Sequence, residues 1–401
     1  MNAEELVRDA VPDQDGPGCA VGLVRAGEPL VTACRGLANL EHRVPITERT
    51  VFHVASVSKQ FTAYAVALLA AEGKLSLDDP VATHLDWFPF PEITVDQLVR
   101  HTSGLRDQWE LLEATGRRME DVITTGDIVR LVAAQRGLNF PPGTQQRYCN
   151  TGYTLLGLLV AAVSGLSLRE FCARRIFEPL GMTNTRFVDD CHEVVPDRAD
   201  SYDGGYRRVV LSYSTAGATS LNTTVADLAR WATHEPAMKA LGEHPVRDYG
   251  LGVWVDATLG TLRHSGADAG FRSHLVVLPE RGLAAVALAN HPSIDPERLC
   301  DMLIGDLFPR PGLFYSGEID THVRLVHDGG ELTLVWPTRE APLRRQHDGT
   351  YVADLPGSAE CPHATIRFSP GHDEFRYSTP GAEGILFHRR EVECSNSEPT
   401  R

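Results

Sequence analysis

The chain has 401 residues, 42% of them hydrophobic, which is enough for two domains that each bury a core. Its formal net charge of −15 argues against nucleic acid or an anionic membrane as the partner, and no apolar run is long enough to span a bilayer. The acidic N-terminus lacks the basic and apolar regions of a signal peptide, and the eight cysteines form no C-x-x-C pair. We therefore expect a cytoplasmic protein without a disulfide framework, a metal site or a cofactor.

Two strand patterns precede the first strong helix pattern. Residues 20–24 and 30–38 alternate or run apolar, as strands do. From Ser56 to Glu72 the chain is rich in Ala and Leu, with apolar residues on one helical face, and Gly73 suits the helix end. We predict a helix over this range, with Ser56 in its first turn, where backbone N–H groups favour developing negative charge.

Ser56 and Lys59 form an S-x-x-K motif at the start of this helix. Positions i and i+3 share a helical face, so the lysine would lie one turn beyond the serine hydroxyl. A serine hydroxyl needs a neighbouring group to take its proton, and an ammonium group serves only if its surroundings lower its pKa. The spacing predicts an activated serine with its proton-handling partner; the alternative is an inert surface pair.

Tyr148 and Asn150 form the second candidate element, a Y-x-N triplet ahead of an apolar helix over residues 153–164. In an extended segment, residues i and i+2 point the same way, so the phenol and the carboxamide could enter one cleft. A tyrosine beside an ammonium group ionises more easily and can act as a general base. The asparagine can donate to a substrate carbonyl and accept from the lysine. The alternative is a helix-entry turn with an aromatic plug.

His264 belongs to one of three H-x-G segments. The other two, His327 to Gly329 and His347 to Gly349, contain Asp-Gly and read as hairpin turns. His264 instead ends an extended run and leads into Ser265, Gly266 and Ala267. The glycine lets the backbone approach a ligand closely and leaves an N–H, such as that of Ala267, to point at an oxyanion.

These three elements in this order resemble the serine enzymes with an S-x-x-K motif: class C β-lactamases, penicillin-binding DD-peptidases, and related esterases and D-aminopeptidases. The resemblance runs from about residue 18 to residue 308 and includes further segments typical of the family, which are Phe52 to Ala55, Ile93 to Leu98, His101 to Leu105, Pro179 to Met182, Asp227 to Trp231 and Tyr249 to Gly252. It implies no cofactor and no metal.

The resemblance also implies a role for each site residue. Ser56 would be the nucleophile that forms an acyl-enzyme, and Lys59 and Tyr148 would together move its proton. Asn150 would hold the lysine and the substrate. The backbone N–H groups of Ser56 and Ala267 would form the oxyanion hole, with Gly266 beside the substrate.

The chain departs from the family pattern at two positions. His264 stands where β-lactamases and DD-peptidases usually carry lysine, and a histidine is mostly neutral at pH 7. We therefore expect weak activity on penicillins and D-Ala-D-Ala substrates, which both present a carboxylate there. Cys149 stands where serine is usual in the triplet, and we interpret it as a small packed residue rather than a nucleophile.

The order of patterns predicts an α+β fold, an α/β sandwich, and the resemblance implies that it is of the β-lactamase/transpeptidase-like type. Strands return at residues 252–255, 261–264, 274–278 and 284–289, and residues 295–308 read as a helix. An antiparallel sheet flanked by terminal helices fits this order, with a mostly helical insertion over about 60–235 in a catalytic domain of residues 1–308.

After residue 312 the character changes to short strands, predicted at 323–326, 331–336, 350–353, 364–369, 374–378 and 384–389. This spacing suggests a small sandwich or barrel over 313–394, followed by a disordered tail at 395–401. The layout resembles that of D-aminopeptidases and cyclising relatives that carry a lipocalin-like β domain after the catalytic one. Such a domain could cover the cleft or stabilise a homodimer.

The predicted function is a serine hydrolase or acyltransferase that cleaves an ester or amide bond of an intracellular small molecule, with an amine as a candidate acceptor. The excess of arginine over lysine suggests a GC-rich genome, and with it natural-product biosynthesis. The alternatives are an esterase or D-aminopeptidase that does not transfer, and a catalytically inactive ligand-binding member of the family.

Overall fold

The computed structural model describes residues 3–118, 120–257, 259–304, 312–328, 331–346, 350–355, 363–369 and 374–390. The chain divides into two compact units. The first comprises Met1–Val255 and Gly260–Ile304, and the second comprises Asp256–Leu259 and Gly305–Arg401. The predicted disordered tail, the glycine-containing tips of the two other H-x-G segments and the end of the predicted helix 295–308 lie outside the described residues.

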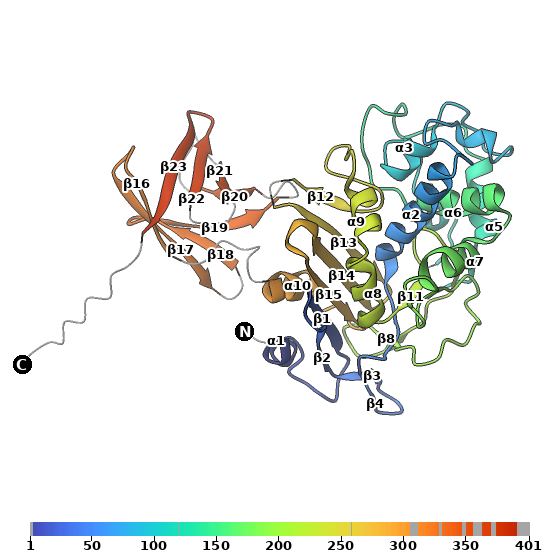
Figure 1. Cartoon of the computed structure of the whole chain (residues 1–401), viewed down its shortest axis with the longest axis horizontal. Coiled ribbons are helices and arrows are strands. Elements are labelled where there is room, and N and C mark those ends of the chain that lie inside the picture. The colour runs from blue at the N-terminus through green and yellow to red at the C-terminus, as the bar shows by residue number, and fades with distance from the viewer. Residues whose placement is uncertain are drawn as a thin grey trace, which may run out of the picture. The chain divides into compact units, whose positions relative to one another are not determined.

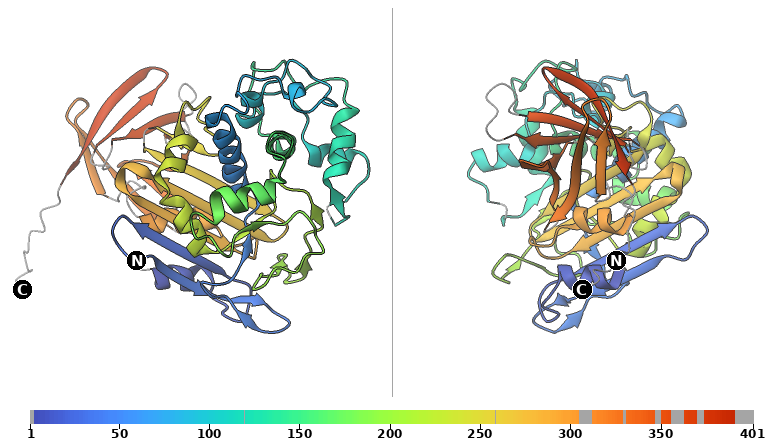
Figure 2. Two further views of the ribbon diagram at one scale, coloured as in Figure 1. Left: turned by 45° about the vertical axis from the view of Figure 1, so that its right-hand side comes forward. Right: turned by 90° about the vertical axis from the view of Figure 1, so that its left-hand side faces the viewer.

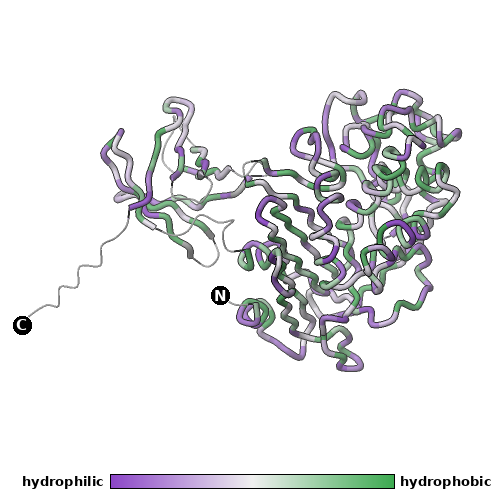
Figure 3. The backbone as a smooth tube through the Cα atoms, in the orientation of Figure 1, coloured by the Kyte–Doolittle hydropathy of each residue, from purple (hydrophilic) through white to green (hydrophobic). Residues whose placement is uncertain are grey.

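A six-stranded sheet in the order β12-β13-β14-β15-β1-β2 forms the centre of the first unit (Figure 1). The pairs β1–β2, β1–β15, β13–β14 and β14–β15 are antiparallel, as predicted. The strands are β1 (Cys19–Arg25), β2 (Val31–Arg35), β12 (Trp254–Asp256), β13 (Thr261–Asp268), β14 (Phe271–Leu278) and β15 (Leu283–Ala289). Every residue of β15 is buried, which is expected for a strand covered on both faces. Figure 3 shows the corresponding concentration of hydrophobic residues along these strands.

Helices pack against this sheet. The terminal helices α1 (Ala3–Ala10) and α10 (Pro296–Ile304) contact the sheet and each other, and α8 (Val225–Ala232) contacts β1, β14 and β15 (Figure 2). The side chain of Val225 lies where a Cβ on Gly22 would be, so α8 sits directly on the backbone of β1. The predicted sandwich of an antiparallel sheet and flanking helices is confirmed.

The segment between β2 and β12 is mostly helical and contains two short sheets beside the small hairpins. Its longest helices are α2 (Ser58–Ala71) and α6 (Asn150–Ser164), which pack on each other. The shorter helices are α3 (Val95–Val99), α4 (Gln108–Ala114), α5 (Thr125–Ala133), α7 (Leu168–Cys172), α8 and α9 (Glu235–Gly242). One short sheet, β5-β11-β7, joins Phe52–His53, Leu221–Thr223 and Arg186–Phe187, and so ties the chain before Ser56 to the chain after Ser220.

The second unit contains a closed barrel of eight strands, β16 to β23, in sequence order. They are Gly312–Ser316, Thr321–Asp328, Glu331–Val335, Glu340–Arg345, Tyr351–Asp354, His363–Phe368, Glu374–Thr379 and Ala382–Arg390. Alternate residues of β21 are buried, and Phe314, Phe375 and Phe387 are among the fully buried side chains of its core. The predicted β domain is thus a barrel, and it contains two strands, β16 and β19, that the sequence analysis did not predict.

Among the described residues, no single helix has the length and apolar character to cross a membrane. Asn150–Ser164 and Leu168–Phe177 pass that test only when taken together, and the pair bends by 75° at its break.

Candidate active site

The turn that carries Ser56 is tightly constrained. Ala55 has a left-handed φ of 46°, and a 3₁₀ turn over Ala55–Val57 leads into α2. Ser56 therefore lies in a short turn just before the α-helix, and not in the first α-helical turn that the sequence analysis predicted. The Ser58 hydroxyl donates to the Ala55 carbonyl and accepts the Leu221 N–H at 3.0 Å, which ties the turn to β11. A non-glycine residue in the left-handed region directly before a candidate nucleophile is typical of a functional turn.

Lys59 contacts three other groups of the site. Its Nζ lies 3.0 Å from the Ser56 Oγ, 2.9 Å from the Asn150 Oδ1 and 2.8 Å from the Ala218 carbonyl oxygen. The side chain is fully buried. A neutral amine has two N–H groups and one lone pair. If the carbonyl and the carboxamide oxygen accept the two N–H groups, the lone pair is directed at the Ser56 hydroxyl.

Burial lowers the pKa of Lys59 from 10.5 to about 7, and the negative charges of Asp268 and Asp107 oppose this shift. Desolvation is the larger effect, since an ammonium group without bulk water loses its hydration. A substantial fraction of Lys59 is therefore neutral at pH 7, which is the state in which it can accept the serine proton.

The ring of Tyr148 also contacts the lysine, with its centroid 4.7 Å from the Nζ. Desolvation raises the pKa of Tyr148 well above 10, and a hydrogen bond with the Ser56 side chain lowers it by less. The residue as a whole is 36% exposed, but the pKa depends on the surroundings of the phenol oxygen. The sequence analysis expected Tyr148 to ionise more easily, whereas desolvation raises its pKa. The phenol is therefore protonated at neutral pH.

Asn150 begins α6 and is oriented by Asp107, a residue that the sequence analysis missed. The Asp107 carboxylate accepts the backbone N–H of Asn150 at 2.6 Å and its side-chain Nδ2 at 3.0 Å. The other amide atom, Oδ1, is thereby turned toward Lys59, as predicted. Asp107 also caps α4 by accepting the Trp109 N–H. Its position before Gln108, Trp109 and Glu110 resembles a helix-capping pattern, but nothing in the local sequence signals its contact with Asn150.

His264 is buried and neutral. Burial and the positive charge of Lys59 lower the pKa of His264 to about 3. Its Nδ1 lies 2.7 Å from the Ser265 carbonyl oxygen, so that nitrogen carries the proton, and the Nε2 accepts the Tyr249 hydroxyl at 3.2 Å. Both ring nitrogens are engaged, and the ring centroid lies 6.0 Å from that of Tyr148.

His101, from the family-like segment 101–105, packs behind these rings. Its centroid lies 4.4 Å from Tyr148 and 4.6 Å from Tyr249, and its Nδ1 accepts the Cys149 N–H at 3.0 Å. Burial lowers the pKa of His101 well below its usual value, so it is neutral as well. His101 thus holds the extended backbone of the Y-x-N triplet in place.

Gly266 and Ala267 bring strand β13 against the nucleophile turn. A Cβ on Gly266 would lie 2.3 Å from the Val54 carbonyl oxygen, so only glycine permits this approach. Gly266, which was expected beside the substrate, therefore packs on the turn. Asp268 and Phe271 close a two-residue hairpin, and hydrogen-bonded pairs alternate along antiparallel strands. The Ala267 N–H consequently points away from β14 and is free of that strand pair, while β13 itself contacts the Ser56 turn.

Cys149 is a packed residue, as the sequence analysis proposed. It is buried, its Sγ donates to the Leu105 carbonyl oxygen at 3.5 Å, and burial raises the pKa of its thiol to about 12. A thiol with this pKa is protonated at neutral pH and is a poor nucleophile. The cysteines among the described residues are free.

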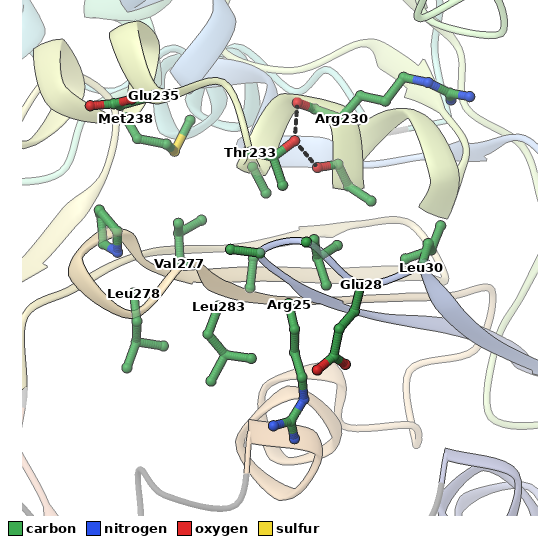
Figure 4. Close-up of a pocket in the computed structure, with 18 of the residues that line it drawn as sticks. Arg25, Glu28, Leu30, Arg230, Thr233, Glu235, Met238, Val277, Leu278 and Leu283 are labelled. Carbon is green, nitrogen blue, oxygen red and sulfur yellow. Dashed lines mark hydrogen bonds between the residues drawn. The ribbon is translucent and has the colours of Figure 1, made fainter.

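A large cavity in the first unit lies away from this site (Figure 4). It has a volume of about 600 Å³ and lies between α8–α9 and the ends of β1, β14 and β15. Its lining contains none of the five candidate side chains, so its volume does not mark the chemistry. A smaller cavity of about 290 Å³ includes Ala267 and Asp268 in its lining.

One group of three potential metal ligands occurs among the described residues: Asp190, Cys191 and His192. Asp190 and His192 are exposed, and the group includes none of the predicted site residues.

Comparison with known proteins identifies the family. The β-lactamase family model matches residues 3–307. The chain belongs to the β-lactamase family. A D-aminopeptidase of Brucella anthropi is 29% identical over 307 residues, which cover 72% of this chain and 58% of that protein. The chain therefore spans little more than half the length of this curated relative. Together these matches support a serine hydrolase of the family.

Two solved structures are similar over nearly the whole chain. The octameric penicillin-binding protein homologue of Pyrococcus abyssi has a TM-score of 0.65 at 22% identity, covering 97% of this chain and 99% of that one, and it supports the fold alone. SurE, which has also been solved with D-Leu, has a TM-score of 0.63 at 25% identity, covering 97% of this chain and 98% of that chain.

Proposed function

We propose that this protein is a serine hydrolase that forms an acyl-enzyme at Ser56 and cleaves an ester or amide bond of a small molecule built from a D-amino acid. The observation that carries the proposal is the environment of Lys59. It is buried, its pKa is about 7, and its Nζ lies 3.0 Å from the Ser56 Oγ. The D-amino-acid part rests on what the similar proteins are called: a D-aminopeptidase, and SurE solved with D-Leu.

In the proposed first step, neutral Lys59 takes the Ser56 proton while the oxygen attacks the substrate carbonyl carbon. The developing oxyanion accepts hydrogen bonds from the backbone N–H groups of Ser56 and Ala267. Tyr148, which burial keeps protonated, then gives its proton to the leaving nitrogen or oxygen and regains one from the Lys59 ammonium. The leaving group departs neutral, and Ser56 carries the acyl group.

In the second step, water attacks the acyl carbonyl carbon while Lys59 takes its proton. The bond between this carbon and the Ser56 Oγ then breaks, Tyr148 and Lys59 return the proton to Ser56, and the carboxylic acid product departs. Asn150, oriented by Asp107, keeps Lys59 in place in both steps. A bound amine in place of water would give an amide product by the same chemistry. That outcome would make the protein an acyltransferase, as in the biosynthetic role considered from the sequence.

Neutral His264 supplies no positive charge for a substrate carboxylate. The site is therefore proposed to favour substrates whose acyl part lacks a carboxylate at that position, unlike penicillins.

Intact-protein mass spectrometry after incubation with p-nitrophenyl esters of several acyl lengths tests the proposal. We expect a mass increase equal to the acyl group on the wild type and none on Ser56→Ala. Ser76→Ala, which alters an exposed serine in the loop beyond α2, is the matched control and should acylate normally. Absence of any adduct, with no turnover of the esters or of D-amino-acid anilides, would favour the non-catalytic binding protein instead.

A further inference from the structure

The cavity of about 290 Å³ beside Ala267 is bordered by charged and polar side chains. Its lining consists of Glu120, Val209, Val210, Tyr213, Ala267, Asp268, Ala269 and Arg272. Ala267 belongs to β13, which contacts the Ser56 turn, so the cavity adjoins the candidate nucleophile. A substrate bound there as an acyl-enzyme would extend a neighbouring substituent into this space.

Asp268 is fixed at the boundary between the cavity and the nucleophile. Its carboxylate lies 3.0 Å from the His53 Nε2 and accepts the Thr219 hydroxyl, and its side chain is 14% exposed. His53 precedes Ser56 by three residues, and Thr219 follows Ala218, whose carbonyl binds Lys59. The Asp268 charge also opposes the lowering of the Lys59 pKa. This carboxylate is thus held within electrostatic reach of the catalytic centre.

Tyr213 lines the same cavity with a hydroxyl group that has no hydrogen-bond partner among the described residues. Only 7% of this residue is exposed, and its ring packs on Trp109 at 4.9 Å between centroids. Asp268 and Glu120 line the same cavity as Tyr213. Burial raises the pKa of Tyr213, and the negative charges of these two carboxylates raise it further. The phenol is hydrogen-bonded to neither carboxylate. Its oxygen and the two carboxylates can therefore all accept hydrogen bonds from one donor group in the cavity.

Arg272 is the one cation in the lining, and it is partly occupied. Its Nη1 donates to the carbonyl oxygens of Phe271 at 2.7 Å and Ala269 at 3.2 Å. Two carboxylates against one guanidinium leave the cavity lining with a net negative charge. The charge balance disfavours a substrate carboxylate and favours a cation.

We propose that Asp268, Glu120 and Tyr213 form a subsite that binds a primary ammonium group of the ligand. The inference rests on the proposed function. In an acyl donor with a free α-amine, the ammonium group is attached to the carbon next to the reacting carbonyl, which matches a subsite beside the oxyanion-binding backbone. An amine acceptor offers the same chemistry, so the experiment separates these two sources.

Calorimetry on Ser56→Ala, which cannot turn over, measures the subsite without catalysis. We expect D-alaninamide to bind at least about 10-fold more tightly than propionamide, which differs by lacking the amine, because a charged hydrogen bond is lost. Adding Glu120→Gln or Tyr213→Phe should remove most of that difference. Glu113→Gln, an exposed carboxylate on α4 outside the cavity lining, is the matched control and should retain it.

Kinetics on the enzyme with Ser56 intact then separates the two sources of the amine. If the donor occupies the subsite, Glu120→Gln lowers kcat/KM for D-alanine p-nitroanilide about 10-fold but not for p-nitrophenyl propionate. If the acceptor occupies it, Glu120→Gln instead reduces capture of D-alaninamide by the propionyl-enzyme.

The proposed subsite would be contradicted if D-alaninamide and propionamide bind equally well and Glu120→Gln alters neither anilide turnover nor capture of D-alaninamide. This holds even if Ser56 is acylated. Selective binding of the amine without acylation of Ser56 would support the subsite and contradict the proposed function.

Discussion

Two hollows lie at opposite ends of strand β14, and their walls differ. The smaller one begins at Arg272 and lies beside Ala267, and its lining includes the charged side chains of Glu120, Asp268 and Arg272. The larger one, near Val277 and Leu278, is mostly apolar. In Figure 4 the hydroxyl of Thr233 is bonded to backbone oxygens of its own helix, at 3.2 and 3.0 Å.

The difference shows why cavity size is a poor guide to chemistry in this fold. At the nucleophile, which lies in neither cavity lining, burial shifts the pKa values of the Lys59 amine and the Tyr148 phenol, and such groups can perform acid–base steps. The apolar hollow has more volume but no such group in its lining. The following substitutions test this contrast.

Replacing the buried lysine should have the largest effect. Lys59→Met keeps a long side chain but removes the base, so we expect kcat/KM to fall about 100- to 10,000-fold. Steady-state kinetics with a p-nitrophenyl ester measures the loss. Lys74→Met, at a lysine whose side chain is 51% exposed, is the control and should stay within about twofold of wild type. A small loss in Lys59→Met would assign the proton transfer to another group.

The pH dependence of acylation should report the lysine directly. Because neutral Lys59 is the reactive form and its pKa is about 7, the acylation rate should rise with pH through a midpoint of about 7. The Asp107 charge raises the pKa of Lys59, so Asp107→Asn should move that midpoint to lower pH. It should also lower kcat about 10-fold, because Asn150 loses its fixed orientation.

Stopped-flow acylation between pH 5 and 9 measures both effects. Asn remains a good helix cap, so α4 should be preserved in this variant. Glu28→Gln removes an exposed carboxylate from the lining of the larger hollow and should change neither midpoint nor rate. A midpoint that does not move in Asp107→Asn would show that the Asp107 charge does not affect the pKa of Lys59.

Cys149→Ser should have the smallest effect. The serine hydroxyl can donate to the Leu105 carbonyl as the thiol does, so kcat/KM should stay within about threefold of wild type. Burial of a more polar atom should cost about 1 kcal/mol of the free energy of unfolding, measurable by denaturant titration. Abolished turnover in a folded variant would show that the thiol takes part in the reaction.

Much of the fold could be predicted because its elements carry local patterns. The apolar residues 20–24 and 284–289 became the neighbouring strands β1 and β15, and Gly73, with φ of 68°, ends α2 as expected. In the barrel, β19 was missed because its sequence, Glu340–Arg345, contains a proline and three charged residues and is a strand only through pairing with β18 and β20.

The site residues were predictable where the interacting side chains are a few residues apart in the sequence. Ser56 and Lys59 are three residues apart, and Tyr148 and Asn150 both face the lysine, as the motifs suggested. Asp107, His101 and Tyr213 reach the site from other segments through the tertiary fold, and no local pattern in one sequence encodes such contacts. The raised pKa of Tyr148 was equally hidden, because desolvation depends on what surrounds the group.

The burial of Lys59 also couples folding to proton release. In the unfolded chain this amine has a pKa of 10.5, whereas in the folded protein the pKa is about 7. Between these pH values the unfolded state binds more protons than the folded state, so this residue releases a proton as the chain folds. Its contribution to the free energy of unfolding therefore becomes more favourable as the pH rises from about 7 toward 10.5. Below about pH 7 the folded protein must hold a buried ammonium group at full cost. The property that makes the lysine a base therefore makes the native state less stable at and below about pH 7 than at higher pH, as far as this residue is concerned.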